Sequence, residues 1–399
     1  MLRKTCARSV QGASHIRSGQ PCQDSYMYME YPDGTTILAV ADGHGSKACP
    51  FSRTGARVAV NVFCSAIGRL IDSFTGNPDL LMAYLNREGE LKVAQEIDRE
   101  WKARIRRIHA ERGRTKTADT GLPDSAETAD TGLIGSAETI YRVDDTENSG
   151  FSENADTRYS PESRIRKTET NAIFRLYGTT LLGLLLTPQF LFAFQIGDGD
   201  IIRIDAKQVT PVIEAEKFLG TQTNSLSATD AWKKAVTVMH RFEGMGTISD
   251  SFRLANVPHK VRDAHIHNQR LWTYHAPVLY LLSTDGFSNS HVSDEALEQT
   301  CREYYEMIQK YGFDAVAASL KSWLSETSEL GCGDDITVAL VCLYPEPSDK
   351  TEENTSACEE HEVEGVSASE EPAEEEGTSV PGKPAEKGFI SISGEDNEE

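Results

Sequence analysis

The sequence predicts an α+β protein, because apolar, β-rich runs alternate along the chain with segments of helical periodicity. Four of these runs, each joined to a Gly/Asp corner, cover residues 35–45, 190–200, 278–288 and 331–344. Runs of Val, Ile, Leu and Phe bounded by Gly and Asp are typical of strands, and their continuous apolarity indicates strands covered on both faces. Apolar residues at helical spacing predict helices over 52–74, 293–312 and 313–331.

The most apolar stretch, LLGLLLTPQFLFAFQIG, is interrupted by Thr187, Pro188 and Gln189 and is too short to span a bilayer. We interpret it as two buried strands joined by a turn. The first residues are basic but lack the apolar segment of a secretory signal, and the eight cysteines form no CxxC pair. These features predict a cytoplasmic protein with free thiols.

Two segments differ in composition from the rest of the 399-residue chain. The segment from about 112 to 170 is polar and contains a tandem repeat, TADTGLPDSAE followed by TADTGLIGSAE. Residues 346–399 hold 18 Asp or Glu against 3 Lys or Arg, which accounts for −15 of the formal net charge of −22. We therefore predict one folded domain over 1–345, interrupted by a disordered insertion at about 112–170 and followed by a disordered acidic tail. Nothing in this charge balance indicates a nucleic-acid partner.

Aspartates stand at the corners next to the predicted strands: Asp24, Asp42, Asp198, Asp285, Asp334 and Asp335. One Asp-Gly corner alone predicts only a turn, but several carboxylates converging on one cleft would repel one another unless cations held them. Mg²⁺ and Mn²⁺ take such oxygen ligands. Two cations bridged by one Asp would lower the pKa of a shared water and clamp a phosphoryl oxygen. The neighbouring His44 would then protonate the leaving alkoxide.

Six motifs, taken in order along the chain, resemble those of the metal-dependent protein phosphatases of the protein phosphatase 2C family, in their bacterial form. They are QDS, VADGHG, YGTTLLG, IGDGD, LLSTDGFS and GDDITVALV, and the resemblance covers residues from about 4 to 344. It implies a four-layer α-β-β-α sandwich, in which two packed antiparallel β-sheets are flanked by helices. It also implies hydrolysis of phosphoserine and phosphothreonine in proteins with two or three Mn²⁺ or Mg²⁺ ions.

The resemblance assigns metal ligands position by position. Asp42 matches the carboxylate that bridges two metals, and the carbonyl of Gly43 adds a ligand to one of them. Asp285 and Asp334 match the ligands of the other metal. Asp198 matches the aspartate of a third, weaker site.

The resemblance also assigns the remaining groups of the site. Asp24 matches the residue that orients a metal-bound water, and His44 matches the proposed general acid. Thr179 and Thr180 fall on the GTT motif, close to the metals. The implied catalytic set is therefore His44, Asp24 and Asp42.

The sequence departs from the family pattern at several positions. Gln23 stands where eukaryotic members often carry Glu, which makes one water-mediated metal contact neutral. Gly199 replaces the serine of GDS, and Asp335 replaces the asparagine of DN, which adds a negative charge beside a ligand.

The arginine that binds the substrate phosphate has no clean match. Arg17 is our candidate, with Arg8 and His15 in the same segment. These departures keep a second hypothesis open, namely a catalytically weak adaptor that binds a phosphoprotein or kinase. A third is another metal-dependent hydrolase of small phosphoesters. For the phosphatase we expect phosphorylated proteins as partners, among them a cognate Ser/Thr kinase or its substrates, and we expect a monomer without membrane contact.

Overall fold

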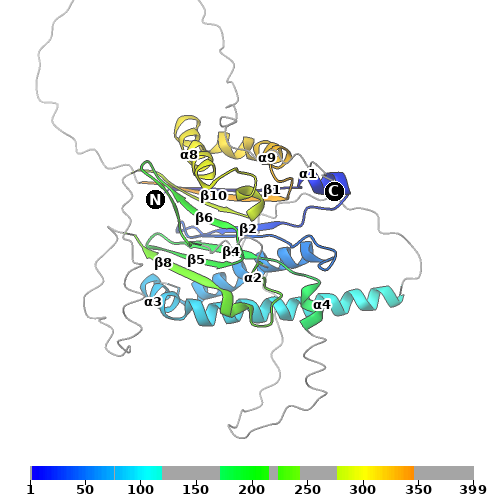
Figure 1. Cartoon of the computed structure of the whole chain (residues 1–399). Coiled ribbons are helices and arrows are strands. Elements are labelled where there is room, and N and C mark those ends of the chain that lie inside the picture. Colours follow the sequence, from blue (N-terminus) through cyan, green and yellow to red (C-terminus); the bar gives the residue numbers. More distant parts are fainter. Residues whose placement is uncertain (1, 76, 119–170, 215–222, 243–275, 346–399) are drawn as a thin grey trace, which may run out of the picture.

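The computed structural model describes residues 2–75, 77–118, 171–214, 223–242 and 276–345. Within them, two five-stranded antiparallel sheets are stacked between two layers of helices (Figure 1). This arrangement confirms the predicted α+β class and its four layers. All seven described cysteines are free.

The first sheet has the strand order β1-β10-β9-β6-β7. Its strands are β1 (Leu2–Val10), β10 (Ile336–Tyr344), β9 (Val278–Ser283), β6 (Asp200–Ile204) and β7 (Val209–Pro211). Its outer face is covered by α8 (Asp294–Tyr311) and α9 (Phe313–Leu330). The short helices α1 (Ala13–Ser18) and α7 (Asp285–Ser288) follow β1 and β9.

The second sheet has the strand order β2-β3-β4-β5-β8. Its strands are β2 (Ser25–Glu30), β3 (Thr36–Ala41), β4 (Leu181–Leu186), β5 (Phe190–Ile196) and β8 (Val236–Arg241). The helices on its outer side are α2 (Ser52–Ser73), α3 (Pro78–Glu88), the π-helical turn η1 (Gly89–Val93) and α4 (Ala94–Ala118), and the 3₁₀ turn η2 (Ala231–Lys234) precedes β8.

Period-two alternation explains why the strands are apolar throughout. In β3, Ile37 and Ala39 face the core shared with α2 and α4, whereas Leu38 and Val40 face the core between the sheets. Both faces of the strand are therefore buried, as its continuous apolarity predicted.

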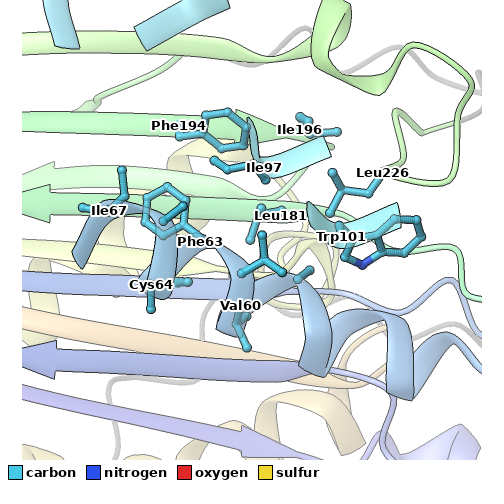
Figure 2. Close-up of a cluster of buried hydrophobic side chains, with 14 of the residues drawn as sticks. Val60, Phe63, Cys64, Ile67, Ile97, Trp101, Leu181, Phe194, Ile196 and Leu226 are labelled. Atoms are coloured by element: carbon cyan, nitrogen blue, oxygen red, sulfur yellow. The ribbon is translucent and has the colours of Figure 1, made fainter. Parts of the chain in front are cut away.

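The core beneath the second sheet is built around large aromatic side chains. Phe63 of α2 packs against Phe194 of β5, with ring centroids 5.8 Å apart (Figure 2). Trp101 of α4 is fully buried, and its indole N–H donates to the carbonyl of Gly55 at 3.0 Å. These contacts fix α2, and with it the loop that precedes the helix, against the sheet.

The helices predicted over 52–74, 293–312 and 313–331 are confirmed as α2, α8 and α9, and the turn at 187–189 joins β4 to β5. One boundary differs, because α4 continues through 112, the approximate start of the expected insertion, to Ala118. The tandem repeat and the acidic tail lie outside the described residues. Of the helices in the described ranges, none combines the length and apolarity needed to cross a membrane.

Candidate active site

Strand register brings the acidic corners to one end of the sandwich. In the first sheet, Val10 pairs with Ile336, and Ser283 pairs with Asp200. In the second sheet, the start of β2 pairs with the end of β3, and the start of β4 with the end of β5. The loops that precede or follow these paired strand ends therefore lie at one end of the sandwich. They carry Asp24, Asp42, Asp198, Asp285, Asp334 and Asp335.

Asp42 stands at the centre of the acidic cluster. Burial raises the pKa of its carboxyl well above the ordinary range, and the charges of Asp24, Asp285 and Asp334 raise it further. These aspartates, far apart in sequence, are thus brought close enough to repel one another.

Two threonines hold the main chain of Asp42. The N–H of Asp42 donates to Thr180 Oγ1 at 2.9 Å, and its carbonyl accepts from Thr179 Oγ1 at 2.7 Å and from the N–H of Thr180 at 2.9 Å. An isolated β-bridge pairs Gly43 with Thr179. The GTT motif therefore acts through the backbone of the DGHG corner.

Asp24 is buried between two further threonines. Its Oδ2 accepts from Thr284 Oγ1 at 2.7 Å and from Thr337 Oγ1 at 2.8 Å. Its Oδ1 is buried and receives no hydrogen bond from the residues that the structure describes. Burial, followed by the charge of Asp335, raises the pKa of Asp24 to about 8.

Asp285 lies at the first position of α7. Its Oδ2 accepts from Asn289 Nδ2 at 3.0 Å. Burial raises its pKa to about 7, with further contributions from the charges of Asp198 and Asp334. Burial also raises the pKa of Asp334, whose Oδ1 accepts from the following N–H at 2.8 Å. Asp198 Oδ2 accepts from Thr223 Oγ1 at 2.7 Å.

His44 is positioned by a close approach of glycine. Its N–H donates to the carbonyl of Gly178 at 3.2 Å. A Cβ at position 178 would lie 2.7 Å from His44 Cδ2, so only glycine leaves room for the ring. Burial lowers the pKa of His44, although the charge of Asp198 opposes that shift. The surroundings therefore favour the neutral imidazole.

Asp335 joins three segments of the chain. Its Oδ1 accepts from the N–H of Gly12 at 2.7 Å, and its Oδ2 accepts from the N–H of Gln23 at 2.6 Å. His15 Nδ1 lies 2.9 Å from Oδ1. The additional charge expected beside Asp334 is thus partnered, and it fixes the segment that leads to Asp24.

Neither candidate arginine has a hydrogen bond or ion pair with an aspartate of this cluster in the described ranges. Arg17 is exposed on α1, with its guanidinium beside Gly333, and forms no hydrogen bond or ion pair with the described residues. Arg8 donates to the carbonyl of Ala7 at 2.8 Å. Gln23 Oε1 is buried without a donor in the described part of the chain.

A family model described as protein phosphatase 2C matches residues 11–325. The chain belongs to the protein phosphatase 2C family. As a member, it is a protein phosphatase and hence a hydrolase. No curated protein matches the sequence significantly.

Several solved structures resemble the chain. The Mycobacterium tuberculosis serine/threonine phosphatase PstP/Ppp is 16% identical, with 86% of this chain and 100% of that chain covered and a TM-score of 0.42. The catalytic domain of PstP in complex with 2 manganese ions is 17% identical, with 85% of this chain and 97% of that chain covered and a TM-score of 0.40. RsbX in complex with magnesium is 12% identical, with 85% and 94% covered and a TM-score of 0.37. The assignment to the protein phosphatase 2C family rests on the family match.

The donor chemistry of this phosphatase's cluster fits a hard divalent cation. Its groups are carboxylates and main-chain carbonyls, the ligands that Mg²⁺ and Mn²⁺ prefer. A cation held there would relieve the repulsion at Asp42. As the side chains stand, no three His, Cys, Asp or Glu residues in the described ranges are grouped so that they could hold a metal ion. Binding would therefore require carboxylates to turn toward one another.

The motif comparison alone did not find the side chains that support the acidic cluster. They are Thr284, Thr337, Asn289 and Thr223. His15 and Asp335 were singled out from the sequence, but their contact with each other was not. Thr284 immediately precedes Asp285, and this position in the sequence was the one signal that it lies near the cluster. The others meet their partners only through the fold.

Proposed function

We propose that this phosphatase hydrolyses phosphoserine and phosphothreonine in proteins with Mn²⁺ or Mg²⁺. The cluster of buried, mutually repelling carboxylates at one end of the sandwich carries this proposal. The residues that would hold the cations are Asp42, Gly43 through its carbonyl, Asp285, Asp334 and Asp198. A divalent cation bound there supplies Lewis-acid chemistry, which lowers the pKa of a water and neutralises phosphoryl charge.

Asp24 and His44 would handle the protons of the reaction. Threonine hydroxyls occupy Asp24 Oδ2, whereas Oδ1 is available to accept a hydrogen bond from the attacking water. Because burial favours neutral His44, its imidazole must gain a proton before it donates one to the leaving oxygen. A phosphate dianion next to the ring favours that protonation. Arg17 is the proposed phosphate contact.

A panel of phosphoserine, phosphothreonine and phosphotyrosine peptides, assayed with and without Mn²⁺, tests this function. We expect Mn²⁺-dependent hydrolysis of the first two peptides, inhibition by EDTA, and a loss of at least about 100-fold in Asp42→Ala and Asp285→Ala, since each removes several kcal/mol of charge stabilisation. Asp314→Ala is the matched control, because Asp314 is an exposed carboxylate paired with Lys4. Metal-independent hydrolysis that survives both substitutions would refute the proposal.

The second candidate is a catalytically weak adaptor that binds a phosphoprotein or a kinase. Two observations favour it: neutral Gln23 beside Asp24, and the exposure of Arg17, which forms no hydrogen bond or ion pair with the described residues. Stoichiometric binding of a phosphoprotein in Mn²⁺, without turnover, would support the adaptor. For either candidate we propose phosphorylated proteins as partners, including a cognate Ser/Thr kinase or its substrates.

A further inference from the structure

A pocket of about 280 Å³ lies beside the acidic cluster. One wall comes from the segment before Asp24 and includes Gln20 and Gln23. The other wall comes from the segment after His44 and runs from Gly45 to the first turn of α2. Gln23 immediately precedes Asp24 and Gly45 immediately follows His44, so each wall of the pocket contains a chain neighbour of a proposed catalytic residue.

The charge of this pocket is opposite to that of the cluster beside it. Its lining includes Lys47 and Arg53 but no Asp or Glu. Both cations are exposed, and neither forms an ion pair or hydrogen bond within the described part of the chain. Lys47 and Arg53 are therefore two uncompensated positive charges at one hollow of a strongly acidic protein.

The end of α2 at this pocket adds to its positive potential. The helix begins at Ser52, its N-cap Phe51 makes no side-chain capping hydrogen bond, and its first turn contains no acidic residue. The positive end of the helix dipole thus faces the same region as Lys47 and Arg53 without an internal counter-charge.

We propose that this pocket binds an anionic group of the substrate protein, a carboxylate or a second phosphate, on a residue that flanks the phosphorylated serine or threonine. The inference rests on the proposed function, which places the phosphoryl group at the aspartates. An extended peptide advances about 3.3–3.6 Å per residue. A residue within a few positions of the phosphorylated one therefore reaches a pocket whose walls adjoin Asp24 and His44. Lys47 and Arg53 would select acidic or multiply phosphorylated sites.

The test compares kcat/KM of the full chain in Mn²⁺ for three phosphoserine peptides of equal length. Their flanking residues are alanines, glutamates, or alanines with one non-hydrolysable phosphonate analogue of phosphoserine. We expect kcat/KM about three- to tenfold higher for the anionic peptides at low salt, as for one or two exposed ion pairs. The preference should shrink at high salt. A preference for the phosphonate peptide alone would identify a phosphate as the ligand, and a preference for both would show that a carboxylate suffices.

The double variant Lys47→Glu/Arg53→Glu should abolish or reverse this preference, and Lys47→Ala and Arg53→Ala should each reduce it. The control is Lys207→Glu, an exposed residue in the turn after β6, a strand that begins beside the acidic cluster and runs away from it. It makes the same change in net charge as Lys47→Glu alone, half that of the double variant, and should keep the preference. Equal kcat/KM for neutral and anionic peptides, or an unchanged preference in the double variant, would overturn the inference.

Direct binding separates this inference from the proposed function. Fluorescence anisotropy is measured with a labelled glutamate-flanked peptide whose phosphoserine is replaced by its phosphonate analogue. Suppose that the protein hydrolyses none of the phosphopeptides but that the double variant binds the labelled peptide about three- to tenfold more weakly. This result would refute the phosphatase reaction and support the anion pocket. Binding that the double variant leaves unchanged would refute the pocket, whatever the activity.

Discussion

Asp24 and Asp335 are buried aspartates at the same end of the sandwich, yet their surroundings differ. Asp335 accepts hydrogen bonds at both oxygens from two main-chain N–H groups and pairs with His15. Asp24 accepts two hydroxyl donors at one oxygen, while its other oxygen receives no donor from the described residues, and its charge raises the pKa of Asp42. Burial is common to both, so the supply of donors distinguishes a carboxylate that holds loops together from one that retains capacity for a ligand.

Removing the carboxyl of Asp335 should have the largest effect on folding. We expect Asp335→Ala to lower the free energy of unfolding by about 2–4 kcal/mol, because two N–H groups lose their acceptor and His15 loses its carboxylate. Urea denaturation measures the change. Asp314→Ala, which removes an exposed carboxylate 2.5 Å from Lys4 Nζ, should cost at most about 1 kcal/mol. Equal losses in the two variants would remove the distinction between Asp335 and an ordinary surface carboxylate.

Divalent cations should stabilise the chain through the aspartates around Asp24 and Asp42, and not through Asp335. We expect Mn²⁺ at about a hundred times its Kd to raise the free energy of unfolding by about 2.7 kcal/mol, since it binds the folded chain only. The effect should be lost in Asp42→Asn and retained in Asp314→Ala. Thermal unfolding with and without Mn²⁺ measures it independently of catalysis. Identical Mn²⁺ shifts in wild type and Asp42→Asn would place the cation elsewhere.

The sequence predicted the strands and corners well because those signals are local. Continuous apolar runs and Gly/Asp turns identified the strand ends, and antiparallel register then placed Asp42 and Asp285 at one edge. The donors of Asp24 were not predictable in this way, since Thr284 and Thr337 lie 260 and 313 residues from it. Their hydroxyls meet Asp24 only because the two sheets stack.

Asp335 illustrates a further limit. From sequence, a second aspartate beside Asp334 is simply an added negative charge. In the fold, the close approach of Gly12 and the position of His15 turn that charge into an anchor for the loop before Asp24. The predicted roles of Asp24, Asp42 and His44 stay predictions until they are measured, whereas their proximity is a property of the structure.

The smallest effect we predict is opposite in sign to that of Asp335→Ala. We expect Asp24→Asn to raise the free energy of unfolding at neutral pH by about 1–2 kcal/mol, because burial and the neighbouring carboxylates raise the pKa of Asp24 to about 8, so that folding requires its protonation, a cost that asparagine avoids. The asparagine keeps an acceptor for Thr284 and Thr337 and gains an amide N–H that can donate to Asp42. Urea denaturation without divalent cations measures the gain, and phosphopeptide hydrolysis should fall at the same time.

Asp335→Asn is the matched control for this substitution, since it makes the same chemical change at a carboxylate whose partners are donors. Its new amide N–H groups would face the N–H groups of Gly12 or Gln23, so its stability should fall. Opposite signs for the two Asp→Asn variants would establish that the cluster around Asp24 carries stored repulsion and Asp335 does not. If Asp24→Asn also destabilised the chain, Asp24 would be a structural carboxylate like Asp335, and the ligand capacity inferred from its unpartnered oxygen would be wrong.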